Sequence, residues 1–147
     1  MIIISVSEEI QTSQYSVLLY LGASFSIVML LACLFYAKKG LKLSLFYTAL
    51  CFSSFYWWAY SKADKFYELA QVGEFLKVSY VSPVSDQLIP LSDIASVTFG
   101  TNTRGAKTCF ISLNTKSGEK FRSANLPEDT QYCKDIRVKL MDLLMLS

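Results

Sequence analysis

The side chains that could do chemistry in this chain are few, and four cysteines are the most reactive of them. They are Cys33, Cys51, Cys109 and Cys133. The chain contains no histidine, and no two cysteines are close enough in sequence to form a typical zinc-binding pair. We therefore expect no metal site. Cys109 and Cys133 form either a disulfide, if they lie in an oxidising compartment, or two buried free thiols.

The other polar residues show no catalytic pattern. Without histidine, the usual proton shuttle is absent. The stretch 100–105 has glycines at both ends but lacks the lysine of a phosphate-binding loop, and no serine occupies the Gly-x-Ser-x-Gly context of a hydrolase. Asp93 and Glu119 are isolated carboxylates, which we interpret as surface residues. We therefore predict a protein that is not an enzyme and that uses no cofactor.

The charge balance excludes one class of partner and leaves another open. The formal net charge is only +2, and no basic patch with interleaved aromatic residues occurs, so we expect no binding to nucleic acid. Arg104 and Lys107 lie together in a polar loop. They are the candidate interaction residues, and membrane lipid is the ligand that they would contact.

Two long uncharged runs, 15–37 and 43–61, organise the first half of the chain. A helix needs roughly 20 apolar residues to cross a bilayer, and both runs come near that length without a proline. Because backbone polar groups must be satisfied internally in hydrocarbon, each run should be helical. The link between them is too short for anything except an antiparallel hairpin, which we place at 15–60. Two buried helices of a soluble protein are the alternative, but such helices normally show a polar stripe, and neither run does.

Residues typical of a membrane surface lie at the ends of these runs. We predict six interface anchors: Trp57, Trp58, Tyr60, Lys38, Lys39 and Lys42.

Small residues spaced four apart allow close contact between membrane helices. Gly22 and Ser26 have this spacing in the first run, and Ala49 and Ser53 have it in the second. The contact could join the two helices of one hairpin or form an oligomer through the hairpin.

A cleaved or lipidated leader is an alternative interpretation of the first run. Residues 30–33, Leu-Leu-Ala-Cys, resemble a bacterial lipoprotein box. However, Glu8 and Glu9 precede the run and no lysine or arginine does, whereas a secretory signal begins with a basic segment. We therefore favour a helix that remains part of the protein.

The remaining residues predict one small α+β domain with a single antiparallel sheet. Residues 1–14 form a leader whose β-branched start suggests a short strand that could pair with the domain. Residues 62–73 continue the second helix and end near Gly73. The domain itself, 74–147, contains alternating strand patterns at 74–81, 87–90, 95–99, 107–115 and 119–123.

An amphipathic helix closes the chain. Pro127 suits the first helical position, and Glu128 and Asp129 suit the positive end of the helix dipole. One face is apolar and consists of Cys133, Ile136, Leu140, Leu143 and Leu144. We expect this face to pack on the sheet.

This order of elements resembles that of bacterial pleckstrin-homology-like domains that follow a pair of transmembrane helices. The resemblance covers about 74–146. Three stretches carry it: 88–94 before a strand, 116–118 at a tight turn, and 126–128 before the last helix. The sequence shows four or five strands where that fold has about seven, and the first ten residues could supply one more. The resemblance implies a module for binding or assembly.

The predicted protein is therefore a two-span protein of the bacterial inner membrane whose domain binds a protein partner. An immunity-type antagonist of a membrane-active toxin is one form; a structural subunit of a membrane complex and a lipid-sensing module are alternatives. The lysines of residues 38–42 favour a cytoplasmic link and a periplasmic domain. Lys62, Lys65 and the N-terminal amine nearly balance them, and the family resemblance favours a cytoplasmic domain.

Overall fold

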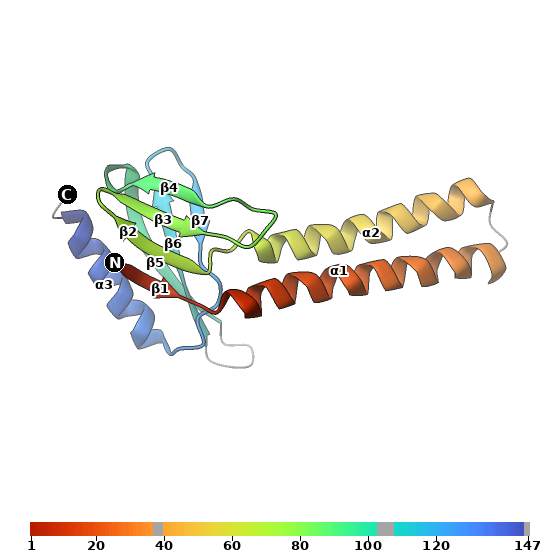
Figure 1. The fold of residues 1–147 in the computed structure, drawn as a ribbon, viewed down its shortest axis with the longest axis horizontal. Coiled ribbons are helices and arrows are strands. Elements are labelled where there is room, and N and C mark those ends of the chain that lie inside the picture. Colours follow the sequence, from red (N-terminus) through yellow and green to blue (C-terminus); the bar gives the residue numbers. More distant parts are fainter. Residues whose placement is uncertain (37–39, 103–107, 146–147) are drawn as a thin grey trace. The chain divides into compact units, whose positions relative to one another are not determined.

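The computed structural model describes residues 1–36, 40–102 and 108–145. They form two units, Met1–Gln11 with Ala63–Ser147, and Thr12–Lys62. We name these the sheet domain and the helical hairpin. The order of elements is β1 (Ile2–Ser5), α1 (Glu8–Leu31) with a π-helical end (Ala32–Tyr36), α2 (Leu41–Ala63), β2 (Glu68–Val72), β3 (Phe75–Ser79), β4 (Gln87–Pro90), β5 (Ile94–Asn102), β6 (Thr108–Thr115), β7 (Lys120–Arg122) and α3 (Thr130–Met145) (Figure 1).

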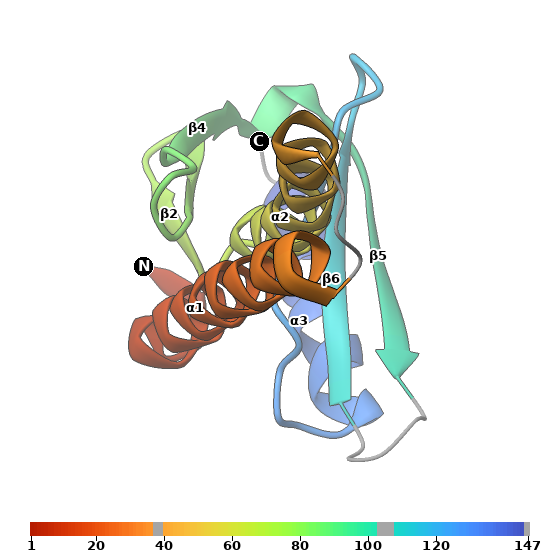
Figure 2. The ribbon, with the colours of Figure 1, turned by 90° about the vertical axis from the view of Figure 1, so that its right-hand side faces the viewer.

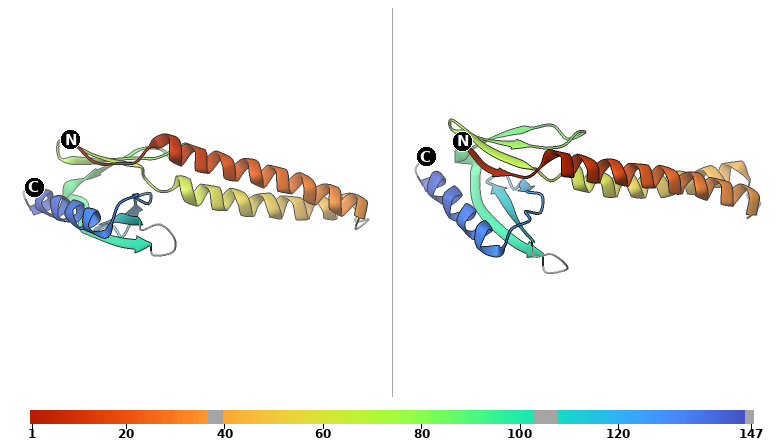
Figure 3. Two further views of the ribbon diagram at one scale, coloured as in Figure 1. Left: turned by 90° about the horizontal axis from the view of Figure 1, so that it is seen from below. Right: turned by 60° about the horizontal axis from the view of Figure 1, so that its bottom comes forward.

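The two helices of the hairpin run antiparallel and side by side (Figures 1 and 3). They approach closely at Gly22, where an added Cβ would lie 2.6 Å from the Cβ of Phe55. The rings of Phe25 and Phe55 pack at 5.9 Å between centroids. Gly22 is therefore a contact position, as its spacing from Ser26 predicts. The matching prediction for Ala49 and Ser53 is wrong, because both are exposed; Phe55 supplies the contact from α2.

Most large apolar side chains of the hairpin point outward. Val28 is 62% exposed on α1 and Phe46 is 58% exposed on α2, which is the opposite of what a helix pair in water requires. Among the described helices, α1 continued to Phe35 is the one that is long and apolar enough to cross a membrane. Its helical start at Glu8 lies well before the predicted residue 15. Tyrosine, tryptophan and serine residues make α2 less apolar.

The sheet domain contains two antiparallel sheets, rather than the single sheet predicted. Strands β1-β2-β3-β4 form one sheet, and β5-β6-β7 form the other. Figure 2 shows β5 and β6 as a long antiparallel pair. Side chains from both sheets form one core, whose most buried members include Ile4, Phe66, Leu69, Leu76, Ile111 and Leu113. The described residues contain seven strands, more than the four or five counted from the sequence.

Strand β1 ties the start of the chain to the residues that follow the hairpin. Ile2 pairs with Ala70, and Ser5 pairs with Glu68. Beyond the strand, the Val6 amide donates a hydrogen bond to the Tyr67 carbonyl at 2.8 Å. The predicted strand in the leader is therefore present, and the sheet domain includes Met1–Gln11 in addition to the predicted 74–147.

The predicted helix at 62–73 is wrong. Helix α2 ends at Ala63, and β2 begins at Glu68. Phe66 and Leu69 are fully buried, so their apolar character reflects the core of the sheet domain and not a helical face. Gly73 has a φ of +62° and turns β2 into β3, which is why a glycine suits this position.

Helix α3 begins at Thr130, later than the predicted start at Pro127. Asp129 is the residue before the helix, and its carboxylate accepts a hydrogen bond from the Tyr132 amide at 3.0 Å. This is the geometry of an N-cap, in which a side-chain oxygen satisfies an otherwise unpaired amide of the first turn. Cys133, Ile136 and Leu140 are buried as predicted, and α3 packs on β5 and β6 (Figure 3).

We expect Ile4→Ala to lower the free energy of unfolding of the sheet domain by about 2–4 kcal/mol, because Ile4 is 1% exposed and truncation leaves a cavity. Pulse proteolysis of the full chain in urea and mild detergent measures this. Ile2→Ala is the matched control: Ile2 lies on the same strand but is 63% exposed, so its effect should stay within about 0.5 kcal/mol. Equal effects would contradict the placement of β1.

Candidate functional site

The strongest candidate site in the sheet domain is a groove between α3 and β5. Its volume is about 570 Å³. We call it the α3 groove. It is lined by Phe99, Lys134, Arg137, Val138, Met141, Asp142 and Met145. Four of the lining residues are apolar, and the charged side chains of Lys134, Arg137 and Asp142 lie among them. The groove therefore suits an apolar ligand that also carries a charged group.

Three apolar residues of the groove, Val138, Met141 and Met145, form a stripe of α3 beside its core face, and the fourth, Phe99, lies on β5. Val138 is 58% exposed and Met145 is 76% exposed. Methionine side chains are flexible and adapt to varied apolar partners. Such exposed apolar residues grouped on one surface often mark an interaction site.

Two cations make the groove partly electropositive. The guanidinium carbon of Arg137 lies 6.0 Å from the centre of the Phe99 ring, on β5, within the range of a cation–π interaction. Lys134 lies one helical turn earlier, and Asp142 is the single acid in the lining. The balance favours a ligand with an acidic group.

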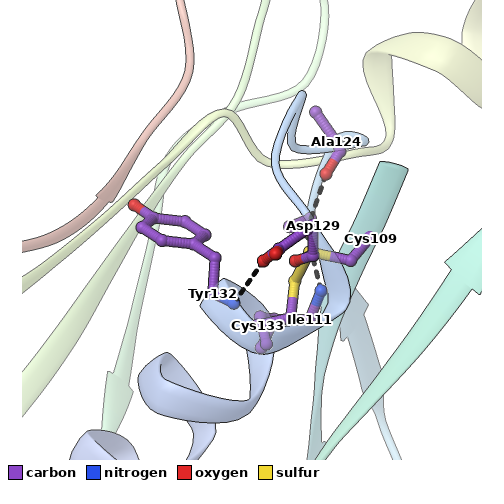
Figure 4. The surroundings of a disulfide bond; sticks show 7 residues. Cys109, Ile111, Ala124, Asp129, Tyr132 and Cys133 are labelled. Atoms are coloured by element: carbon purple, nitrogen blue, oxygen red, sulfur yellow. Dashed lines mark hydrogen bonds between the residues drawn. A yellow bond between two sulfur atoms is a disulfide. The ribbon is translucent and has the colours of Figure 1, made fainter. Parts of the chain in front are cut away.

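A disulfide fixes the first turn of α3 against the sheet. Cys133 on α3 is bonded to Cys109 on β6, with their Cα atoms 6.2 Å apart (Figure 4). Of the two alternatives left by the sequence, the structure thus contains the disulfide. Close to it, the Ser123 hydroxyl accepts from the Ile111 amide at 2.9 Å and donates to the Ala124 carbonyl at 2.8 Å. The end of α3 that begins the groove is therefore covalently anchored.

The edge of β5 adds a second kind of recognition element beside the groove. Strand β5 pairs with β6 alone among the described strands. An edge strand presents backbone N–H and C=O groups that can pair with an extended segment of another chain. The groove therefore combines an apolar floor, cations and a free sheet edge.

The structure places the predicted site residues unevenly. Arg104, Lys107, Lys38 and Lys39 lie outside the described residues. Lys42 is exposed in the first turn of α2. Near the other end of α2, Trp57, Trp58 and Tyr60 are 78%, 53% and 40% exposed. These three aromatic side chains face outward, as interface anchors would. Asn102 and Thr108, which flank residues 103–107 in the sequence, line a polar groove that shares Lys134 with the α3 groove.

Sequence reasoning missed the α3 groove. A signal was present: Val138, Met141 and Met145 form an apolar stripe at helical spacing beside the face of Cys133, Ile136 and Leu140. What the sequence could not show is that Phe99 lies beside this stripe, because that contact joins a strand to a helix more than thirty residues later.

Within the described residues, no group of three or more histidine, cysteine or acidic side chains is placed to hold a metal ion. The chain matches no known protein-family model and no curated protein sequence.

Reduction of the disulfide should destabilise the sheet domain. A cross-link between residues separated by 24 positions restricts the unfolded chain, which corresponds to about 3–4 kcal/mol in the chain-entropy model. Pulse proteolysis with and without reductant should show this loss, and Cys109→Ala with Cys133→Ala should reproduce it. Cys51→Ser removes a free thiol and serves as the control. A domain indifferent to reductant would refute a structural role for the bond.

Proposed function

We propose that the protein is a two-span, non-enzymatic protein of the bacterial inner membrane whose sheet domain binds a protein partner in the α3 groove. The membrane part rests on α1, which is long and apolar enough to span, and the number of spans rests on the pairing of β1 with β2. The binding part rests on the groove itself.

The β1–β2 pairing limits how often the intervening chain can cross a membrane. Val6 and Tyr67 share a hydrogen bond, so both lie on one side of any bilayer. Residues between them must then cross an even number of times. If α1, the helix that is long and apolar enough to span, crosses once, α2 must return. Residues 43–61 of α2 carry no charge, and their tyrosines and tryptophans suit the headgroup region.

The same pairing argues against removal of α1 as a signal sequence. Cleavage after an N-terminal apolar helix would also remove everything before it. Here that would take away β1 and its core residue Ile4, which is 1% exposed. The sheet domain would lose an edge strand and part of its core, so α1 is better explained as a permanent part of the protein.

Two independent features favour a periplasmic sheet domain. Lys38, Lys39 and Lys42 cluster in the link between the helices, and positive residues concentrate on the cytoplasmic side. The Cys109–Cys133 disulfide suits an oxidising compartment such as the periplasm. In a two-span protein the link and the sheet domain lie on opposite sides of the membrane. A cytoplasmic link and a periplasmic domain are therefore the same topology, and the two features agree.

The arrangement of the sheet domain supports the proposed pleckstrin-homology-like fold. Four antiparallel strands are followed by three more and then by one terminal helix. In this interpretation the hairpin is an insertion between the first and second strands. Fold alone does not define a function, so the binding proposal rests on the α3 groove.

The proposed partner presents an extended apolar segment with an acidic residue. The apolar side chains would cover Val138 and Met145, and the acid would pair with Lys134 or Arg137. Because the disulfide anchors α3, little ordering should be needed on binding. An immunity-type protein that blocks a membrane-active toxin is one form of this proposal. Its test is loss of the gene, which should be lethal only in cells that make the toxin.

Cysteine labelling tests the two-span topology. In a chain with Cys33→Ser and Cys51→Ser, we introduce Gly40→Cys or Leu88→Cys; an added Cβ at Gly40 meets open space, and Leu88 is 62% exposed. A membrane-impermeant maleimide applied to spheroplasts should label residue 88, and residue 40 only after lysis.

Labelling of both positions from one side would contradict the two-span proposal. The reverse pattern, with residue 40 labelled from outside, would keep two spans and place the sheet domain in the cytoplasm.

Partner binding should depend on the α3 groove. A photo-crosslinking amino acid at Val138 should capture a discrete protein in cells, and Lys134→Glu with Arg137→Glu should abolish that product by reversing the charge of the lining. The same photo-crosslinker at Leu88, which is 62% exposed against 58% for Val138 but lies on β4, is the control. An adduct that forms equally at both positions, or that survives the charge reversal, would contradict the assignment.

A further inference from the structure

The outward face of the three-stranded sheet has a composition that the α3 groove does not explain. Across it, Thr98, Ser112 and Arg122 lie opposite one another, and Gly100 lies opposite Phe110. The other outward positions of the three strands carry hydroxyl, amide or ammonium groups, at Ser96, Asn102, Thr108, Asn114 and Lys120. This face therefore holds two cations and no acid.

Arg122 is held in a stacked position at the centre of this face. Its guanidinium carbon lies 3.6 Å from the centre of the Phe110 ring. The ring in turn lies against Gly100, where an added Cβ would be 2.3 Å from the Cζ atom of Phe110. Glycine is thus required beneath the ring, and the ring supports the guanidinium. Stacking leaves the edge of a guanidinium free for bidentate binding of a phosphate or carboxylate.

Two buried polar atoms of this face have no hydrogen-bond partner. They are the Nε of Arg122 and the hydroxyl oxygen of Ser112. Ser112 is 2% exposed. Buried polar groups in folded proteins are almost always paired, and an exception often marks the place of a bound water or ion. A guanidinium and a hydroxyl on a face without acids call for an oxyanion.

The chain connection brings this oxyanion site close to the end of α2. The Phe66 amide donates to the Arg122 carbonyl at 3.1 Å, and Phe66 follows the last residue of α2, Ala63, by three positions. Three residues span at most about 11 Å. If α2 crosses the bilayer, as proposed above, this short link keeps Arg122 near the headgroup region, where lipid phosphates are the abundant oxyanions.

We infer that Arg122 and Ser112 form a binding site for the phosphate of an anionic membrane lipid. Arg122 donates from its guanidinium to two phosphate oxygens, Ser112 donates its hydroxyl, and Lys120 adds positive charge at the rim. This inference rests on the proposed membrane crossing of α2 for the choice of lipid, but the oxyanion chemistry of the site stands on the sheet domain alone.

Native mass spectrometry of the full chain in uncharged detergent tests the site. The probes are dioctanoyl-phosphatidylglycerol, dioctanoylglycerol without phosphate, inorganic phosphate and a short glutamate-rich peptide. Arg122→Gln should weaken binding of the phosphatidylglycerol about tenfold or more, and Ser112→Ala should weaken it a few-fold. Lys139→Gln is the control, because Lys139 is an exposed cation that belongs to neither proposed site; it should bind like the wild type.

Equal weakening in the Arg122 and Lys139 variants would indicate general charge attraction and overturn the site. Binding that does not change in Arg122→Gln would also overturn it. A site occupied by inorganic phosphate but not by the lipid, or one that prefers the glutamate-rich peptide, would overturn the assignment to lipid. If Arg122→Gln fails to fold, binding by Arg122→Lys and Ser112→Ala tests the site instead. Arg122→Lys keeps the positive charge but loses the two parallel N–H donors of the guanidinium, so it should also weaken binding. The labelling experiment judges the crossing of α2 separately, so the two failures can be told apart.

Discussion

The pairing of β1 with β2 is the constraint on which the rest of the structure depends. These strands close a loop that contains the whole hairpin, from Val6 to Tyr67. The entropic cost of closing a flexible loop rises only slowly with its length, and two antiparallel helices shorten the effective loop further by bringing its ends together. The buried side chain of Ile4 and the irregularity between Ile2 and Ile4 then fix the register. The hairpin thus brings β1 and β2 together, and the pairing of these strands holds the two ends of the hairpin together.

Much of this fold could be predicted from periodicity alone, and the errors have a common origin. The uncharged runs, the strands and the apolar face of α3 follow from local patterns. The segment after α2 does not, because the spacing of Phe66, Leu69 and Ala70 is compatible with a helix, and strand structure there depends on pairing with β1 and β3. For the same reason the sequence pointed to Ala49 and Ser53, whereas the contact across the hairpin is made by Phe55. Pairing between distant segments leaves no local trace.

The candidate sites were harder to predict than the fold. Arg104 and Lys107 are conspicuous in the sequence because they are cations in a polar stretch between two strand patterns. The residues with the most unusual surroundings are different ones. Arg122 is one cation among 14, and it becomes distinctive only because Phe110 lies beneath its guanidinium and Gly100 makes room for the ring. A site made by three strands cannot be found by spacing along one of them.

The two proposed sites use opposite faces of the same strand. Phe99 lies opposite the core residue Ile111 and contributes to the α3 groove, whereas Gly100 lies opposite Phe110 on the outward face. Because side chains alternate along a strand, a shift of register by one residue would exchange these faces. It would place a glycine where the groove needs a ring and a ring where Phe110 needs space. The burial of Val97 and Ile111 prevents that shift. The same core contacts that stabilise the sheet domain therefore keep the proposed partner-binding face separate from the proposed lipid-binding face.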